Sequence, residues 1–336
     1  MTDVSVLIPV LDEGRWLRDT AAAMLAQRGA GDLELLFVDG GSTDETPAIL
    51  AELAASDPRV RVLRNPARIV PAALNVGLRA ARGRYVARMD AHAWYPPDYL
   101  ARGIARLERG DVDWVTGPAV PRPTGRWARR VALALGSKLG QGGSAKWGAA
   151  SGERELDTGV FGGIWRRELL EELGGWDESF TVNEDAEMAG RVLSRGGRIV
   201  CVDAMATGYA PRDDLRALAR QYWRFGLFRV RTSHRHPVAL RPAHLVSAAI
   251  AGSALAALAA PRPLRRPARA MTALYAAAVA VESARIAPRP AEATPIAAAL
   301  ATMHLAWGAG FLAGCARFGP PAAGIRRALS SAARRR

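Results

Sequence analysis

Acidic side chains follow apolar segments at two points of the chain, and a third acid opens a predicted helix. Asp39 comes after the apolar run 33–38, and Asp90 closes the run 85–89. Asp185 lies in the sequence Asn-Glu-Asp-Ala-Glu at 183–187. Carboxylates bind hard divalent cations, accept hydrogen bonds and take up protons. These positions are therefore the first candidates for chemistry.

Asp90 and His92 are two residues apart in a chain predicted to be extended. Side chains with that spacing point the same way, so they can offer an oxygen and an imidazole nitrogen to one divalent ion. Such an ion could bridge a diphosphate and neutralise it as it departs. Taken alone, the pair is better explained as an aspartate that caps a turn beside a stacked histidine.

Asp39 and Asp185 each have a catalytic and a structural interpretation. Asp39 precedes two glycines, which let a ligand approach the backbone closely, and its carboxylate can accept hydrogen bonds from a base or a ribose. It can also cap the following helix. Asp185 can act as a general base toward a hydroxyl, or simply stabilise the N-terminus of a helix.

A basic and aromatic segment, Gln-Tyr-Trp-Arg-Phe at 221–225, lies on a predicted helix with further arginines at 220, 229 and 231. It could contact a diphosphate or a lipid-linked acceptor. It could equally form an amphipathic helix on a membrane surface. Both interpretations stay open.

Alternating strand and helix patterns position the first two aspartates. Continuous apolar runs predict buried strands at 4–10, 33–38, 60–63 and 85–89. Helical patterns lie between them at 14–28, about 47–55 and 71–82. This alternation predicts an α/β fold with a mostly parallel sheet covered by helices, and a ligand outside the carboxyl ends of the strands.

The middle of the chain changes character. Residues 118–152 are rich in Gly, Pro, Arg and Trp, and their Gly-rich half is predicted to be a loop over a site. Helices are expected again at 166–173, from 183 to about 195, and at 213–230.

The predicted second domain, residues 236–336 after a first domain at 1–235, carries most of the charge. It contains 13 Arg and 2 Glu, a net charge of +11 of the chain's +14. Three apolar stretches lie between the arginines, at 245–260, 271–281 and 296–316. This pattern suits an anionic membrane surface better than nucleic acid. A soluble Ala-rich helical subdomain is the alternative.

The arginine distribution also predicts a topology. Four Arg lie in 262–269 and six in 317–336. If the positively charged connections stay on the cytoplasmic side, the second and third stretches form a spanning hairpin. The first stretch then lies in the interface or re-enters the membrane. The second stretch would have to include Glu282 and Arg285, which are spaced to pair on one helix face. No secretory signal is expected, and the catalytic part is expected in the cytosol.

The order of these segments carries a resemblance. SVLIPVLDE, VDGGSTDET, LNVGLRAARGRYVARMDAH, GGWDE, NEDAE and QYWRF follow one another over residues 4 to about 235. Together they resemble the family 2 glycosyltransferases, which have a GT-A fold. The details RMDAHA, YAPR and QYWRFG are similar to the membrane-associated enzymes of succinoglycan-type exopolysaccharide synthesis.

The resemblance implies a nucleotide site and a metal site. Pro9, Asp12 and Glu13 match the family's nucleotide pocket, and Asp39 matches the acid that holds the uracil or the ribose. Asp90 matches the first acid of the Asp-x-Asp motif, which binds Mg²⁺ or Mn²⁺ on the diphosphate. His92 takes the place of the second acid.

The resemblance also implies roles for later residues. Asp185 matches the catalytic base of inverting members. Gln221 and Arg224 match the Gln-x-x-Arg-Trp motif, with Phe225 in place of Trp. Four residues are thereby assigned to the acceptor and diphosphate side, namely Trp176, Glu184, Gln221 and Arg224.

The implied function is transfer of a sugar, with inversion, from a nucleotide diphosphate donor to a hydroxyl of a lipid-linked or polysaccharide acceptor. A UDP-hexose is the expected donor, and the cytoplasmic face of the membrane is the expected location.

Two alternatives are a sugar nucleotidyltransferase, which usually has a Gly-rich basic loop after the first strand, and a non-catalytic membrane scaffold. A dinucleotide-binding oxidoreductase is disfavoured, because the turn at 10–14 lacks the Gly-x-Gly-x-x-Gly pattern. The chain's two cysteines are too few for a disulfide framework.

Overall fold

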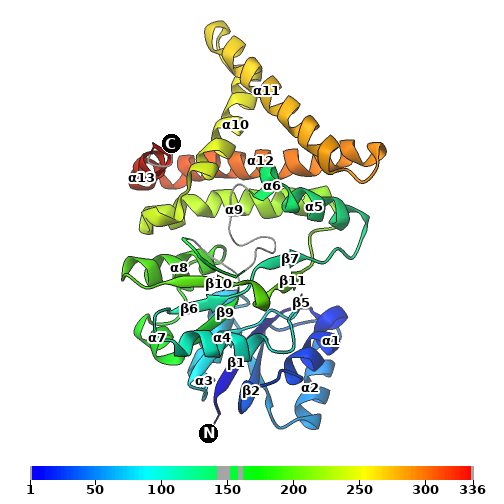
Figure 1. Cartoon of the computed structure of the whole chain (residues 1–336), viewed down its shortest axis with the longest axis vertical. Coiled ribbons are helices and arrows are strands. Elements are labelled where there is room, and N and C mark those ends of the chain that lie inside the picture. The colour runs from blue at the N-terminus through cyan, green and yellow to red at the C-terminus, as the bar shows by residue number, and fades with distance from the viewer. Residues whose placement is uncertain (1, 142–151, 158–161, 334–336) are drawn as a thin grey trace. The chain divides into compact units, whose positions relative to one another are not determined.

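The computed structural model describes residues 2–141, 152–157 and 162–333. The chain divides into two compact units (Figure 1). The first comprises Met1–Val120 and Gly148–Tyr209, and the second comprises Pro121–Trp147 and Ala210–Arg336. The predicted Gly-rich loop lies largely outside the described residues.

An eight-stranded sheet organises the first unit, in the order β3-β2-β1-β4-β9-β6-β10-β8. Four strands from the first 90 residues are parallel neighbours: β1 (Val4–Val10), β2 (Leu33–Asp39), β3 (Val60–Arg64) and β4 (Tyr85–Arg88). They match the predicted strands closely. The other four are β6 (Trp114–Thr116), β8 (Glu153–Glu155), β9 (Gly163–Arg166) and β10 (Ile199–Val202).

The second half of the sheet is mixed. β9 runs antiparallel to both β4 and β6, while β10 is parallel to β6 and β8 is antiparallel to β10. A small second sheet joins β5 (Ala93–Trp94), β11 (Thr207–Tyr209) and β7 (Ala119–Pro121).

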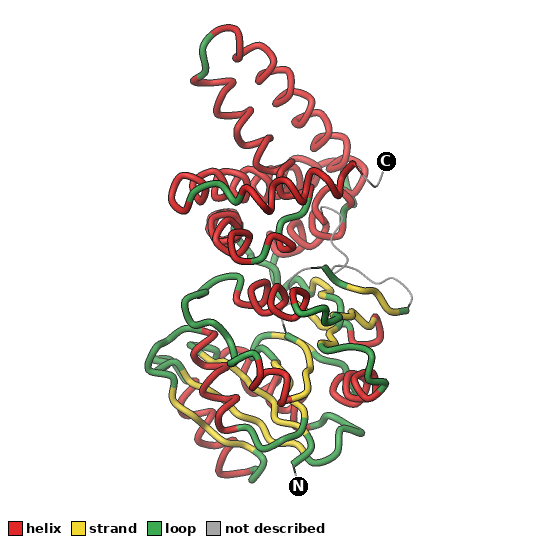
Figure 2. The backbone as a smooth tube through the Cα atoms, turned by 90° about the vertical axis from the view of Figure 1, so that its left-hand side faces the viewer, coloured by secondary structure: helices red, strands yellow, loops and turns green. Residues whose placement is uncertain are grey.

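Helices cover both faces of the large sheet (Figure 2). Alternate residues of β1, from Val4 to Val10, enter one core with side chains of α1 (Gly14–Leu25), α2 (Thr46–Ser56) and α4 (Tyr99–Glu108). Leu7 points the other way and packs against Gly77 of α3 (Val70–Ala80). The unit also contains α7 (Arg167–Glu172) and α8 (Glu184–Ser194). This is the architecture that the alternating pattern predicts.

The second unit is helical. Its helices are α5 (Arg126–Gly136), α6 (Lys138–Gln141), α9 (Leu215–Arg235), α10 (Pro242–Ala259), α11 (Arg262–Ile286), α12 (Pro290–Phe318) and α13 (Ala322–Ala333). α12 lies at the centre and packs on α5, α9, α10 and α11. Its glycines at 308, 310 and 314 meet backbone atoms of α9 and α10, so these helices touch without intervening side chains.

The division into units does not follow the predicted boundary at 235/236. α5 and α9 cluster with the C-terminal helices, because α12 buries its large apolar side chains against α9 and its neighbours. Trp307 and Phe311 of α12 share a core with Val230 of α9 and Leu240.

The apolar stretches also form helices in a different pattern. By length and composition alone, α10 and α12 are the candidate membrane spans among the described residues. α11 is not among them, so the predicted hairpin of 271–281 with 296–316 is not supported. The expected pairing of Glu282 with Arg285 is confirmed, with Nε and Oε2 2.7 Å apart.

Candidate active site

Three neighbouring strands end at one edge of the sheet with acidic residues. Asp39 is the last residue of β2, Asp12 and Glu13 follow β1, and Asp90 follows β4. Because β2, β1 and β4 are adjacent and parallel, their carboxyl ends lie at the same edge. Pro9, half-buried in β1 opposite Val38, belongs to the same end of the sheet.

Ser42 connects Asp39 with Asp12. The Ser42 hydroxyl donates to Oδ1 of Asp39 at 2.6 Å and accepts from the backbone N–H of Asp12 at 2.9 Å. The Asp12 carboxylate in turn accepts the N–H of Thr43 at 2.8 Å. The loops after β1 and β2 are therefore tied together, and the Asp39 carboxylate orders the turn that follows it.

Glu13 and His92 join the first strand loop to the segment after β4. Oε1 of Glu13 lies 2.8 Å from Nδ1 of His92. The His92 side chain is 46% exposed, whereas that of Glu13 is only 18% exposed. A carboxylate that contacts one ring nitrogen orients the imidazole, as in many carboxylate–histidine–metal arrangements.

Arg88, the last residue of β4, joins Asp90 to the start of α8. Its Nε donates to Oδ1 of Asp90 at 2.9 Å, and its Nη1 donates to Oε1 of Glu184 at 3.0 Å. The arginine side chain is 8% exposed, so both ion pairs are shielded from water. Asp185 is the next residue after Glu184, and its Oδ1 accepts the N–H of Ala186 at 2.7 Å.

These contacts set the charges of the acids. Burial opposes ionisation of Asp90, but the charges of Arg88 and His92 outweigh burial and lower its pKa. The pKa of Glu184 is raised, first by burial and then by the neighbouring Asp185, although Arg88 opposes both. Asp90 is therefore an anion at neutral pH, and Glu184 holds its proton more tightly than an exposed glutamate does.

Unusual backbone conformations cluster at the same edge. Among the described residues, the non-glycine residues with positive φ are Asp12 (54°), Arg68 (55°) and Asn183 (63°). Asp12 and Asn183 flank the polar contacts just described, and Arg68 donates from Nη1 to the carbonyl of Gly41 at 3.1 Å. Such conformations are typical of functional sites.

The structure thus brings Asp12, Glu13, Asp39, Asp90, His92, Glu184 and Asp185 into one connected set of contacts and chain neighbours. Sequence reasoning missed the residues that join them, which are Ser42 and Arg88, and also Arg68. The signal for Arg88 was present, because residues 88, 90 and 92 alternate in the way that places strand side chains on one side.

Trp176, Gln221 and Arg224 are the predicted site residues outside this set of contacts. Trp176 is 3% exposed and packs edge-on against Trp165, and its backbone is held by the Asn75 side chain. A side chain so buried offers no surface to an acceptor, which corrects the assignment of Trp176. Gln221 and Arg224 are on α9, in the second unit.

The donor set at Asp90 and His92 is small. In the described residues, no group of three or more His, Cys, Asp or Glu side chains is arranged to hold a metal. Mg²⁺ and Mn²⁺ in nucleotide sites are often bound by one or two protein side chains, with phosphate and water oxygens completing the shell. An ionised aspartate beside a carboxylate-oriented histidine fits that mode.

Comparisons with known proteins agree with this architecture. The model of Glycosyl transferase family 2 matches residues 5–173. The succinoglycan biosynthesis protein ExoA of Rhizobium meliloti (strain 1021) is 33% identical over 314 residues, which cover 92% of this chain and 94% of that protein. ExoO of the same organism, also named for succinoglycan biosynthesis, is 30% identical over 212 residues, which cover 62% of this chain and 60% of that protein.

A solved structure shows the same fold. The mannosyltransferase PcManGT from Pyrobaculum calidifontis, in complex with GDP-Man and Mn²⁺, is similar with a TM-score of 0.58 and 23% identity. The match covers 89% of this chain and 86% of that chain. It agrees with the GT-A fold that the sequence segments imply.

Proposed function

The chain belongs to the family 2 glycosyltransferases, and from that premise we propose that it transfers a sugar from a nucleotide diphosphate donor to an acceptor hydroxyl with inversion. A UDP-hexose is the proposed donor. The proposed acceptor is a lipid-linked or polysaccharide glycan of exopolysaccharide synthesis, the process that the names of ExoA and ExoO give for those relatives. Family membership decides against the sugar nucleotidyltransferase alternative.

One observation carries the proposal, namely that side-chain contacts and neighbours in the chain connect the three aspartates. Asp39 contacts Ser42, which contacts Asp12, and the adjacent Glu13 contacts His92. Two residues before His92, Asp90 contacts Arg88, which contacts Glu184 beside Asp185. A nucleotide, a diphosphate and a reacting hydroxyl need such groups within one site.

We assign the nucleotide to the loops after β1 and β2. Asp39 is partly exposed and is fixed by Ser42, so its second oxygen, which makes only a 3.3 Å contact with Ser42 N–H, can accept a hydrogen bond from the base or ribose. Asp12 and Glu13 line the same loops. Arg68, held over Gly41, adds a cation near the expected phosphates.

Asp90 and His92 are proposed to hold Mg²⁺ or Mn²⁺. When bound, the ion offsets negative charge on the diphosphate leaving group. The chain's own contribution is to keep Asp90 ionised through Arg88 and to orient His92 through Glu13.

Asp185 is proposed to be the general base. It lies in the first turn of α8, which Asn183 begins in a left-handed conformation and which Arg88 ties to β4 through Glu184. The carboxylate takes the proton of the acceptor hydroxyl as that oxygen attacks the anomeric carbon. Gln221 and Arg224 remain proposed contacts to the acceptor or diphosphate.

The C-terminal helices are proposed to place the enzyme on the cytoplasmic face of the membrane, beside its lipid-linked acceptor. Two apolar helices and the full-length similarity to ExoA support membrane association.

A donor screen tests the proposal. Membranes that contain the full chain are incubated with single UDP- or GDP-sugars, Mn²⁺ or Mg²⁺ and a lipid-linked glycan pool, and the products are identified by mass spectrometry. We expect one donor to add one hexose mass to a lipid-linked glycan, with inverted anomeric configuration by NMR. Release of nucleoside triphosphate from sugar-nucleotide and pyrophosphate, without glycan extension, would contradict transfer.

A further inference from the structure

Large apolar side chains are concentrated on the outside of α10 and α11. Leu258 is 80% exposed, and Leu274 is 73% exposed. The exposed large apolar residues of these helices are Val246, Leu255, Leu258, Leu264, Met271, Leu274 and Val281. On α12, by contrast, Ile296, Leu300 and Met303 are at most 1% exposed. Exposed apolar side chains gathered on one pair of helices mark an interaction site.

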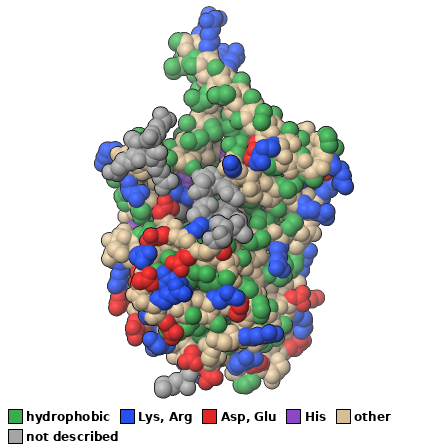
Figure 3. All heavy atoms as spheres, viewed as in Figure 1, with side chains coloured by type: hydrophobic (Ala, Val, Ile, Leu, Met, Phe, Trp, Pro, Cys, Tyr) green, Lys and Arg blue, Asp and Glu red, His purple; other side chains and the backbone are tan. Residues whose placement is uncertain are grey.

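The charge of the α10–α11 hairpin is cationic up to residue 281, and Glu282 near the end of α11 is paired with Arg285. No Asp or Glu occurs from residue 242 to 281, and four arginines, at 262, 265, 266 and 269, lie near the turn between the helices. Figure 3 shows hydrophobic side chains along the hairpin and Lys or Arg at its closed end. The combination complements an anionic lipid surface, which offers phosphates and hydrocarbon side by side.

Two of these arginines form hydrogen bonds within the hairpin, and the other two do not. Nε of Arg265 donates to the carbonyl of Ala260, and Nε of Arg269 donates to that of Ala257, so both cap the end of α10. Arg262 and Arg266 are exposed and form no hydrogen bond or ion pair within the described part of the chain. Their charges are available to phosphate groups.

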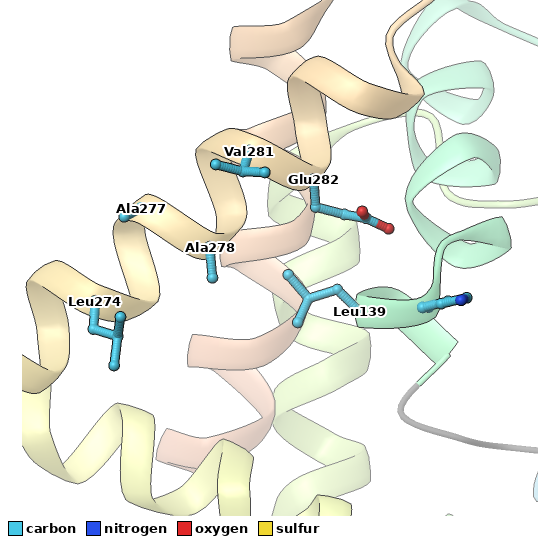
Figure 4. A pocket seen from close by; sticks show the side chains of 7 residues that line it. Leu139, Leu274, Ala277, Ala278, Val281 and Glu282 are labelled. Carbon is cyan, nitrogen blue, oxygen red and sulfur yellow. The ribbon is translucent and has the colours of Figure 1, made fainter.

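An apolar pocket continues the same surface. It has a volume of about 530 Å³ and lies between α6 and α11 (Figure 4). Leu139, Leu274, Ala277, Ala278 and Val281 line it, with Lys138 and Glu282 as its charged residues. Since Leu274 and Val281 belong to both the pocket and the exposed face, hydrocarbon chains that cover one can enter the other.

α12 is apolar for a different reason. It runs along α9, and a Cβ atom at Gly226, Gly310 or Gly314 would collide with the backbone of the facing helix. α9 carries arginines at 216, 220, 224, 229, 231 and 235. A bilayer-spanning α12 would draw these charges into hydrocarbon, at a high free-energy cost. α12 is therefore the core helix of its unit.

We propose that the α10–α11 hairpin lies in one leaflet of an anionic phospholipid bilayer and that α10, α11 and α12 do not cross it. The exposed leucines contact acyl chains, and Arg262 and Arg266 contact lipid phosphates. The four arginines near the turn oppose passage of the hairpin through the hydrocarbon core. This rests on the membrane association in the proposed function and names the element and the lipid chemistry that produce it.

Vesicle flotation of the full chain tests the lipid contact. The pair Arg262→Gln and Arg266→Gln should weaken binding to phosphatidylglycerol-containing vesicles about tenfold or more and leave binding to pure phosphatidylcholine unchanged. The pair Arg262→Lys and Arg266→Lys should bind like the wild type. Equal binding of the Gln and wild-type chains to anionic vesicles would overturn the charge contact.

The apolar contact has its own variants. Leu255→Ser with Leu258→Ser should weaken binding to both vesicle types about tenfold or more, because each leucine loses its transfer into acyl chains. Leu329→Ser is the matched control, since Leu329 is 59% exposed but lies on α13. Two results would overturn the proposal, because they would show that a protein surface covers the hairpin. One is unchanged vesicle binding by the double variant, and the other is dissociation of a wild-type dimer into monomers when the two leucines are replaced.

A cysteine at the connection between α11 and α12 tests the topology. Ala287→Cys, in a Cys315→Ser background, should react with a membrane-impermeant maleimide in vesicles whose cytoplasmic face points outward. Reaction only after permeabilisation would mean that a helix crosses the bilayer. Sugar transfer, measured on the same samples, separates the two proposals. If the chain binds vesicles but transfers no sugar from any donor, only the proposed function is contradicted. If it transfers sugar but does not bind anionic vesicles, only the proposed membrane contact of the hairpin is contradicted.

Discussion

Arg88 contacts an acid on each side of the proposed reaction centre, so its loss should affect both stability and turnover. Arg88→Met leaves Asp90 and Glu184 poorly solvated without their cation, and we expect a loss of about 3–5 kcal/mol in the free energy of unfolding. We also expect kcat to fall, because the start of α8 is no longer tied to β4. Chemical unfolding and steady-state kinetics measure the two effects.

A second buried pair supplies the control. Arg191 pairs with the fully buried Glu187 at 2.8 Å, and both residues lie on α8. Arg191→Met should destabilise the chain comparably but leave turnover per folded molecule near normal. If both variants lower kcat equally, Arg88 has only a structural role.

The proposed base gives a separate prediction. Asp185→Asn removes the proton acceptor and keeps the shape of the side chain, so the variant should bind donor normally and turn over at least about a hundredfold more slowly. Asp19→Asn, an exposed change on α1, should have no effect. Near-normal transfer by Asp185→Asn, measured in the donor screen with saturating donor, would mean that another group is the base.

At the scale of single residues, the positions of the acids at the strand ends were predictable from the sequence, but the side chains that contact them were not. Spacing after strands identified Asp39 and Asp90, because strand ends are visible in a hydrophobic pattern. Trp176 was assigned through the resemblance of its segment to the family, whereas in the structure Asn75, a hundred residues earlier in the chain, holds its backbone and the side chain is buried. Such long-range contacts leave no local pattern.

At the scale of elements, Glu34 joins three strands and predicts a pH dependence. It accepts hydrogen bonds from Ser5 of β1, from Arg61 of β3 and from the N–H of Arg82. Burial opposes its ionisation, but these bonds outweigh burial and lower its pKa. Its contribution to stability is therefore complete above the unfolded pKa of about 4.5 and is lost as the pH falls through the lower folded value.

Glu34→Gln should therefore cost about 1–3 kcal/mol at neutral pH, and less in acid. Urea unfolding of the variant and the wild type at neutral pH and below about pH 4 measures the difference. If the difference in unfolding free energy between wild type and variant stays constant or grows on acidification, the ionised carboxylate is not the stabilising form. Glu172→Gln, an exposed change, should show no gap.

Helix glycines give a prediction for the second unit. Gly226→Ala should destabilise it by about 1–3 kcal/mol, because the new methyl meets the carbonyl of Trp307. Gly252→Ala should be neutral or stabilise by up to about 1 kcal/mol, since the nearest atom to its Cβ is 3.9 Å away. Thermal unfolding in detergent compares the two. Equal effects would mean that α9 and α12 are not packed backbone to backbone.

The elements of the first 90 residues were predictable because each strand is a short apolar run bounded by turn residues. The middle of the chain was not, since α5 forms at Arg126–Gly136, in a segment rich in Pro and Arg where no helix was predicted. The antiparallel placement of β9 between β4 and β6 also escaped prediction, because pairing between distant segments is decided by tertiary contacts.

At the scale of the whole molecule, donor binding should protect a defined part of the chain. Saturating UDP-sugar with Mn²⁺ should slow backbone hydrogen exchange at residues 10–14, 39–46 and 88–92. A donor concentration of a hundred times Kd stabilises the folded state by about 2.7 kcal/mol. The α10–α11 hairpin should be unaffected. Protection confined to the hairpin, or none at the strand ends, would contradict the placement of the nucleotide.

Composition alone could not rank the apolar helices. The third stretch is the longest, so it was predicted to span, but α12 owes its composition to the helices that surround it. In its most apolar window 44% of residues are buried, against 22% for α10. Only the neighbours of a helix distinguish a core helix from one that faces lipid.

The second unit is built from two separate segments, 121–147 and 210–336, and this limits how the enzyme can be shortened for production. A gene that stops after residue 235 removes the apolar C-terminal helices, and with them α12, which covers α5 and α9. The apolar surfaces of α5 and α9 that pack on α12 would then be exposed to solvent, and the recombinant product would aggregate during purification. A soluble form is better sought by recoding the exposed leucines of the hairpin while every helix is retained.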